Sequence, residues 1–139
     1  MKVFVDTGAW LALQIKNDLH HHAARKFSQK LEGRRAHLFT NSFVLSEAYT
    51  RLIYDVNLEA ARVLRQKVIA GSNKGNLTLI EVNSMDRNQA WEILRKFSDH
   101  KLSFTDATII ANFEKYRMDI IFTFDRHFEA VKLPTQMVN

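Results

Sequence analysis

The feature that most constrains this chain is a repeated alternation of short apolar segments with longer segments of helical periodicity. Four segments rich in β-favouring residues predict strands at residues 2–5, 37–40, 77–82 and 119–124. Strands that alternate with helices are typical of βαβ units, whose strands pair in parallel and whose helices cover both faces of the sheet. The expected fold class is therefore α/β, a three-layer α/β/α sandwich with a central mostly parallel sheet.

The helices are predicted from apolar residues that recur every three or four positions and from capping residues at their ends. They are expected at about residues 18–32, 42–54, 57–70, 84–97 and 103–116. In the first of these helices the apolar stripe contains Leu19, Ala23, Phe27 and Leu31. The segment GSNKGN, residues 71–76, is expected to end the third helix and to form a loop, because glycine and asparagine favour turns.

Composition restricts the class of protein. The chain has 139 residues, of which 46% are hydrophobic and 25% are charged, as expected for one globular domain that spans residues 1–139. Because there is no cysteine, disulfides and thiolate metal sites are excluded. No apolar run reaches the ~18 residues that a membrane span needs, and the first residues do not form a signal peptide. We therefore expect a cytoplasmic protein with no membrane contact.

A basic surplus indicates a polyanionic partner. Lysine and arginine number 20 against 15 aspartates and glutamates, which gives a net charge of +5. Such a surplus suits binding to the phosphate backbone of a nucleic acid. A soluble protein can also be basic without such a partner, so the charge alone leaves both interpretations open.

Polar side chains follow the ends of the predicted strands. Asp6 comes directly after the first strand and Asp125 after the last long one, while Asn41 and Ser42 follow the second. Ligands of parallel α/β sheets bind beyond the carboxyl ends of the strands, so these side chains are expected at one edge of the sheet. Glu47 lies one to two turns into the helix that starts at the same edge.

A fourth carboxylate, Asp106, lies in the first turn of the helix predicted from Ser103. Each carboxylate also has a structural explanation, since Asp6 or Thr7 can cap a helix and Ser103 with Asp106 has the spacing of a capping box. Four converging carboxylates, however, repel one another, and their burial without partners is costly. They therefore favour a hard divalent cation, Mg²⁺ or Mn²⁺, which can ionise water and stabilise an in-line phosphoryl displacement.

Four motifs in this sequence resemble those of the PIN domain, and among PIN domains the chain is most similar to the VapC-type toxin ribonucleases. The motifs are VDTGAW with Asp6, TNSFVLSEAYTRL with Ser42 and Glu47, LSFTDATIIANF with Asp106, and IIFTFDRHF with Thr123 and Asp125. The resemblance extends from residue 3 to about residue 128, and it is specific because all four motifs occur together. No residue of the acidic quartet departs from the family pattern.

The resemblance implies a three-layer fold and a metal-dependent cut of single-stranded RNA. It assigns catalysis and metal binding to Asp6, Glu47, Asp106 and Asp125, with polar support from Thr7, Ser42 and Thr123. It also implies a homodimer and a small antitoxin that blocks the site by offering an arginine or lysine to the carboxylates. The helix segments at 23–27 and 44–52 are the expected docking surfaces. Family members also include inactive and non-toxin forms, so the toxin role stays open.

Several other side chains have two interpretations. Arg51 and Arg126 are candidate substrate-binding residues, because one lies a turn beyond Glu47 and the other directly follows Asp125. Pairing with a neighbouring acid on the surface is an equal alternative for both. The histidines at 20–22 are expected on the surface, because consecutive helix residues point about 100° apart and cannot share one ion. The aromatic residues expected in the core rather than as base-stacking platforms are Trp10, Phe113, Tyr116 and Phe128.

Two other phosphate chemistries use this kind of sheet. A haloacid-dehalogenase-like phosphatase needs a second aspartate two residues after the first, and that position is Gly8. A receiver domain needs an acidic pair after its first strand, which this chain lacks. The remaining alternative is a catalytically silent module that binds RNA or a partner protein. Binding of Mn²⁺ at the carboxylates would distinguish an enzyme from such a module.

Overall fold

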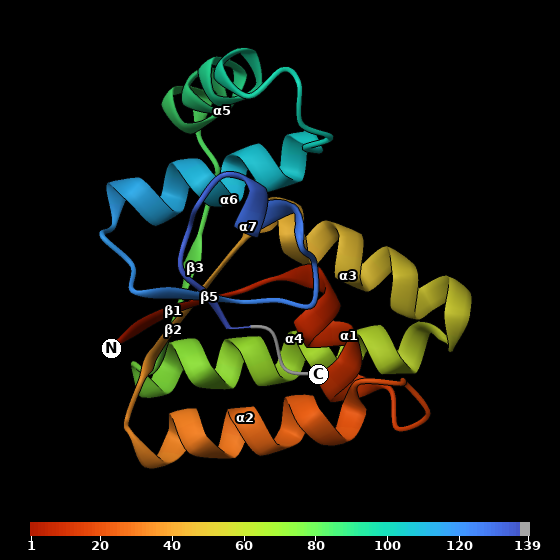
Figure 1. The fold of residues 1–139 in the computed structure, drawn as a ribbon. Helices are drawn as coiled ribbons and strands as arrows, with labels where there is room; N and C mark the ends of the chain where they lie inside the picture. The colour runs from red at the N-terminus through yellow and green to blue at the C-terminus, as the bar shows by residue number, and fades with distance from the viewer. Residues whose placement is uncertain (137–139) are drawn as a thin grey trace.

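The computed structural model describes residues 1–136 and contains a parallel sheet flanked by helices (Figure 1). The strands are β1 (Lys2–Val5), β2 (His37–Asn41), β3 (Leu77–Ile80), β4 (Ile120–Phe122) and β5 (Thr135–Gln136). The helices are α1 (Thr7–Gln14), α2 (His21–Gly33), α3 (Ser42–Asp55), α4 (Leu58–Lys74), α5 (Ser84–Lys96), α6 (Phe104–Lys115) and α7 (His127–Ala130). Neighbouring strands are hydrogen-bonded in the order β3-β2-β1-β4-β5, and every pairing is parallel.

Helices cover both faces of the sheet, as Figure 1 shows. In that view α2 and α4 lie below the strands, whereas α6 lies above them with α5 packed on its outer side. The predicted three-layer α/β/α sandwich is therefore confirmed. None of the helices formed within residues 1–136 is both long and apolar enough to cross a membrane.

The core is built on strands that are buried on both faces. Val3, Phe4 and Val5 of β1 are at most 1% exposed, and Ile121 and Phe122 of β4 are equally buried. A central parallel strand requires such a continuous apolar run, because helices cover both of its faces. α6 is itself buried along most of its length, since it lies between the sheet and α5.

The carboxyl ends of the strands form one edge of the sheet. β1 and β4 run side by side, with Val5 paired to Phe122. The pairing extends one residue further, because the backbone N–H of Asp6 donates to the carbonyl of Phe122 at 3.1 Å. α1 and α3 begin close after β1 and β2, so the side chains in their first turns lie at this same edge.

The predicted end of α4 at Gly71 is wrong, because the helix continues to Lys74. Gly75 is the residue that adopts the left-handed conformation, with φ of 82°, and its N–H donates to the carbonyls of Gly71 and Ser72. Glycine reaches this conformation without the steric cost that a Cβ would add. Most of the loop predicted at 71–76 is therefore helical.

The start of α2 also differs from the prediction. The Asp18 side chain accepts a hydrogen bond from the His20 N–H at 2.8 Å, and the Asp18 carbonyl accepts one from the His21 N–H at 3.0 Å. This local turn replaces the first helical turn, because an aspartate side chain competes for nearby backbone donors. Leu19 consequently lies outside the helix and is 91% exposed. Strands β3 and β4 are likewise shorter than predicted.

The helix segments expected to dock a partner each have one face in the core and one face that is exposed. Val44, Ala48 and Leu52 are 0% exposed and Phe27 is buried as well, so their side chains face the core. Lys26 and Thr50 in the same segments are exposed, so docking at these helices stays a prediction. The exposed apolar residues of this region lie around the junction of α3 and α4, and they are Ile53, Tyr54, Val56 and Leu58.

The prediction for the aromatic residues is confirmed, whereas of the three histidines expected on the surface only His22 is exposed and the other two are half-buried. Trp10, Phe113 and Phe128 are buried, and Tyr116 packs against the core. His20 stacks on the ring of Phe124 and His21 contacts the carbonyl of Ala12. Within residues 1–136 these histidines form no group that could hold a metal ion.

Candidate active site

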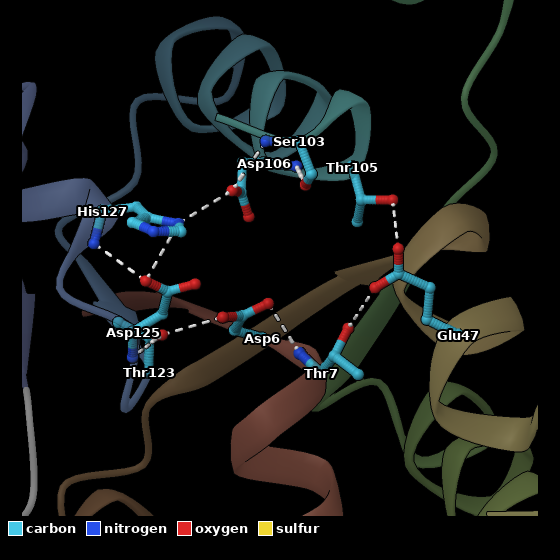
Figure 2. Close-up of polar contacts among 9 residues, drawn as sticks. All are labelled: Asp6, Thr7, Glu47, Ser103, Thr105, Asp106, Thr123, Asp125 and His127. Atoms are coloured by element: carbon cyan, nitrogen blue, oxygen red, sulfur yellow. Dashed lines mark hydrogen bonds and ion pairs between the residues drawn. The ribbon is translucent and has the colours of Figure 1, made fainter. Parts of the chain in front are cut away.

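The four carboxylates singled out in the sequence line one pocket at the carboxyl edge of the sheet. The pocket has a volume of about 580 Å³, and Asp6, Glu47, Asp106 and Asp125 all contribute to its wall. Figure 2 shows their side chains pointing toward a common centre from different parts of the chain. Asp6 follows β1, Glu47 lies on α3, Asp106 lies on α6 and Asp125 lies between β4 and α7.

Asp6 is a buried carboxylate, 7% exposed. It is the N-cap of α1, and its two oxygens accept hydrogen bonds from the Thr7 N–H at 2.7 Å and the Thr123 hydroxyl at 2.8 Å. The pKa of Asp6 is raised from 3.8 to about 7, chiefly by burial and also by the negative charges of Asp106 and Asp125, although the two hydrogen bonds lower it. Asp6 therefore carries its charge only at a cost unless a cation lies nearby.

Thr123 joins two of the carboxylates at the end of β4. Its hydroxyl donates to Asp6 and accepts a hydrogen bond from the Asp125 N–H at 2.9 Å. The Thr123 side chain is completely buried, whereas Asp125 is half-buried. A hydroxyl can make both contacts because it is a donor and an acceptor at once. The residue predicted to support the site thus fixes the spacing between Asp6 and Asp125.

Asp106 caps its helix and also lies at the pocket. It completes a capping box, because the Ser103 hydroxyl accepts from the Asp106 N–H at 3.0 Å and Asp106 Oδ2 accepts from the Ser103 N–H at 3.1 Å. It also lines the pocket. Burial raises the pKa of Asp106 and the charge of Asp125 adds to this, although hydrogen bonds from Ser103 and His127 lower it.

Glu47 is held from both sides by threonine hydroxyls. Thr7 donates to Oε2 of Glu47 at 3.3 Å, and Thr105 donates to Oε1 at 2.8 Å. Thr7 belongs to α1 and Thr105 to α6, so the contacts join three helices around one carboxylate. Thr7 is a predicted supporting residue, whereas Thr105 has no signal in the sequence, because it lies 58 residues from Glu47.

A buried polar network behind the pocket fixes α3 against α6. Asn41 caps α3 by accepting a hydrogen bond from the Val44 N–H at 2.9 Å. The amide of Asn41 also donates to Thr108 at 3.2 Å and to Asn112 at 2.9 Å, both on α6. Because Glu47 and Asp106 lie on these two helices, the network sets the distance between them.

Ser42 does not line the pocket. Its hydroxyl accepts a hydrogen bond from the Val82 N–H at 3.2 Å, at the end of the segment that follows β3. This contact ties the start of α3 to the neighbouring part of the sheet edge. The structure therefore gives Ser42 a contact with the scaffold and no contact with the carboxylates.

Basic side chains lie at the pocket as well. Arg51 and Arg126, both predicted, contribute to its wall together with Lys101, which the sequence analysis did not single out. Arg51 also pairs with Asp55 at 3.4 Å in an exposed ion pair, and exposed pairs of this kind are weak. Arg51 thus lies where it could contact a substrate, and it also forms the surface ion pair that was the alternative interpretation.

His127 is another pocket residue that the sequence analysis did not single out. Its Nδ1 lies 3.2 Å from Oδ1 of Asp125 and 3.5 Å from Oδ2 of Asp106. The backbone N–H of His127 donates to Oδ1 of Asp125 at 2.8 Å. Its position two residues after Asp125 is the only sign of this role in the sequence.

The donor set of the pocket suits a hard divalent cation. Its carboxylates supply the oxygen ligands that Mg²⁺ and Mn²⁺ prefer. Burial, with a smaller contribution from neighbouring carboxylates, raises the pKa of both Asp6 and Asp106, so a cation in the pocket would stabilise their charged forms. Within the described part of the chain, Asp106, Asp125 and His127 also offer possible ligand atoms within 4.8 Å of one another. The residues present therefore fit a metal-dependent enzyme.

The sequence is similar to known nucleases. It matches the family model of the PIN domain over residues 3–133. It is also 28% identical over 131 residues to the 23S rRNA-specific endonuclease VapC20 of Mycobacterium tuberculosis, and the match covers 92% of each chain.

Solved structures share the fold. The crystal structure of Mycobacterium tuberculosis VapC20, a sarcin-ricin loop cleaving toxin, matches with a TM-score of 0.82 and 26% identity over 94% of this chain and 95% of that chain. VapBC2 from Rickettsia felis, bound to a DNA fragment from their promoter, matches with a TM-score of 0.73 and 13% identity over 100% of both chains. FitAcB from Neisseria gonorrhoeae matches with a TM-score of 0.63 and 13% identity over 96% and 95%. The resemblance to VapC-type proteins is confirmed, and the chain belongs to the PIN domain family.

Proposed function

We propose that this chain is a metal-dependent endoribonuclease that hydrolyses single-stranded RNA at the carboxylate pocket, as the toxin of a toxin–antitoxin pair. The observation that carries the proposal is the gathering of four carboxylates, from four separate segments, in one open pocket of a PIN domain. PIN domains are nucleases, and the similar protein VapC20 is a 23S rRNA-specific endonuclease. Both findings support hydrolysis of RNA phosphodiester bonds.

The carboxylates are proposed to hold Mg²⁺ or Mn²⁺. Asp6, Glu47, Asp106 and Asp125 supply oxygen ligands, and the bound cation would supply a water that ionises near neutral pH together with charge stabilisation of the phosphoryl group. The chain's own hydroxyls orient the ligands, because Thr123 holds Asp6, and Thr7 holds Glu47. A fixed ligand geometry is what a metal-dependent hydrolase requires from its protein.

The basic residues of the pocket are proposed to hold the RNA backbone. Arg51, Lys101 and Arg126 lie at the wall that also carries the carboxylates. A phosphate that approaches four carboxylates is repelled by them, and nearby cationic side chains offset this repulsion. An RNA strand that lies between the basic side chains and the carboxylates would place a phosphodiester beside the proposed cation site.

Cleavage of a mixed single-stranded RNA pool tests the function directly. We expect cuts in the presence of Mg²⁺ or Mn²⁺, no cuts in excess chelator, and loss of most activity in Asp106→Asn. Equal cleavage with and without chelator would contradict the metal dependence. The alternative, a catalytically silent module, predicts intact RNA under all conditions, and a binding module that lacks the metal site would also fail to bind Mn²⁺.

An antitoxin is proposed to bind the exposed apolar surface where α3 meets α4. This surface contains a groove with an almost wholly apolar lining that includes Tyr49, Ile53, Leu58 and Ala61. Exposed apolar patches rimmed by polar residues mark protein interaction sites, and Arg62 and Arg65 rim this one. A pull-down with a candidate antitoxin that captures the wild type tests the assignment: Leu58→Asp is expected to abolish capture, and undiminished capture would exclude this surface.

We further propose that the chain acts in the cytoplasm as a homodimer built from a single PIN domain. Light scattering of the purified protein at micromolar concentration tests the dimer, for which we expect twice the 16.2 kDa mass of the chain. A mass equal to that of one chain at all concentrations would exclude it.

A further inference from the structure

The two carboxylates nearest His127 use their oxygens unequally. Oδ2 of Asp106 accepts the Ser103 N–H at 3.1 Å, and Oδ1 of Asp125 accepts the His127 N–H at 2.8 Å. His127 Nδ1 faces these same two oxygens, at 3.5 Å and 3.2 Å. Within residues 1–136, Oδ1 of Asp106 and Oδ2 of Asp125 receive no hydrogen bond. One oxygen of each carboxylate is therefore engaged, and the other is available.

Local chain geometry places the imidazole in this position. The hydrogen bond from the His127 N–H to the Asp125 side chain forms a turn of the kind that aspartate favours. That turn directs the His127 ring back over Asp125 and toward Asp106 on α6. Figure 2 shows the ring pointing at both carboxylates from one side, with Asp6 on the other side of the two.

We propose that His127 is a positioning residue for the metal site, whose Nδ1–H is shared between Asp106 and Asp125. The shared donor holds Oδ2 of Asp106 and Oδ1 of Asp125 on the outer side, so that the free oxygen of each carboxylate faces the cation. It also reduces the repulsion between two neighbouring negative charges. The inference rests on the proposed function, because it describes how this chain prepares the cation site.

The alternative is that His127 itself binds the cation through Nδ1. Its distances to the two carboxylate oxygens resemble those between adjacent ligands of an octahedral ion, which are about 3 Å for bonds of ~2.1 Å. Against this, both oxygens nearest the ring already accept backbone hydrogen bonds. The ring therefore lies on the engaged side of the carboxylates. Direct binding of the cation by Nδ1 is one of the outcomes that the experiment below distinguishes.

The test measures Mn²⁺ binding without RNA, by calorimetry and electron paramagnetic resonance, in wild-type protein and three variants. Hydrogen-bond partners of metal ligands typically contribute 10- to 100-fold in affinity, so His127→Ala is expected to weaken Mn²⁺ binding about 10-fold. His127→Asn keeps an N–H donor at a comparable distance from the backbone and is expected to stay within about threefold of wild type. His22→Ala, which removes an exposed histidine outside the pocket, is the matched control and should bind as wild type does.

The outcomes separate this inference from the proposed function. Weaker binding in His127→Ala, rescue in His127→Asn and no nitrogen bound directly to Mn²⁺ in the resonance spectrum support the positioning role. Equal affinity in wild type and His127→Ala would overturn it, and so would a directly bound nitrogen that disappears in His127→Ala. In either of these cases the metal site and the proposed function still stand. Absence of Mn²⁺ binding in the wild type would overturn both. Circular dichroism melts verify that each variant is folded.

Discussion

Raising the pH from 5 to 8 in the absence of metal is expected to destabilise this protein, because Asp6 must lose its proton inside the fold. The ordinary pKa of the carboxyl is 3.8, and burial raises it to about 7 in the folded state. A raised pKa means that the folded state binds the proton more tightly than the unfolded state does. The resulting stabilisation is fully present below pH 3.8 and is lost as the pH rises through about 7.

The size of the effect follows from the two pKa values. At about 1.4 kcal/mol per pH unit, the change from 3.8 to about 7 is equivalent to about 4 kcal/mol of unfolding free energy. About 2 to 3 kcal/mol of this falls between pH 5 and pH 8, because the folded-state pKa of about 7 lies inside that range and the unfolded-state pKa of 3.8 lies below it. A domain is typically stable by only 5–15 kcal/mol, so such a loss is readily measurable.

Urea unfolding of chelator-treated protein at pH 5, 6, 7 and 8 measures this loss, and Asp6→Asn is the matched variant. Asparagine keeps an oxygen for the Thr7 N–H but carries no proton that dissociates in this range. The wild type should lose about 2 to 3 kcal/mol more than Asp6→Asn between pH 5 and pH 8. Parallel pH profiles for the two proteins would show that Asp6 is charged at low cost and would refute the reasoning.

Addition of Mn²⁺ to the same unfolding experiment tests whether Asp6 belongs to the metal site. At pH 8, a millimolar concentration of Mn²⁺ should raise the unfolding free energy of the wild type, because a ligand that binds only the folded state stabilises it by mass action. Asp6→Asn should gain much less, since it lacks one carboxylate of the site. A gain of equal size in both proteins would place the Mn²⁺ elsewhere on the molecule.

Three further predictions concern other residues. Glu47→Gln should lower the rate of RNA cleavage by several orders of magnitude at saturating Mg²⁺, because charge stabilisation by the bound metal lowers the activation barrier by several kcal/mol. Single-turnover kinetics measure this rate. Arg51→Ala and Arg126→Ala should each flatten the slope of log affinity against log salt by about 0.7, the value for one phosphate of a single strand; fluorescence anisotropy measures it. Asn41→Ala should destabilise the fold by about 2–4 kcal/mol in urea unfolding, because it removes a cap and leaves buried partners on α6 unsatisfied.

The positions of the strands and of the carboxylates are predictable because each rests on a local pattern. A strand that is buried on both faces must be continuously apolar, and Asp6 stands where such a run stops. The end of α4 is less predictable, because Gly71 and Gly75 have the same identity and only the backbone shows which one is left-handed. The four-residue α7 is too short for any periodic pattern.

The polar contacts of the site are the part that the sequence does not reveal. Thr105 reaches Glu47 because α6 packs beside α3, and this depends on the network around Asn41 rather than on residues close in sequence. His127 reaches Asp106 because a turn at Asp125 reverses the chain just after β4. Such contacts depend on how helices pack and on side-chain direction, which a periodic pattern does not encode.

The electrostatics of the pocket connect catalysis with control by a partner. Burial makes the charged form of Asp6 unfavourable, and Asp106 and Asp125 add negative charge. Any cation that reaches the centre relieves this, whether it is a proton, a divalent metal or the guanidinium of an arginine. These three occupy the same few ångströms, so they must exclude one another. An antitoxin that inserts an arginine would therefore inhibit the nuclease by occupying the place of the metal, while its apolar contacts at the α3–α4 surface supply the affinity that a single exposed ion pair could not.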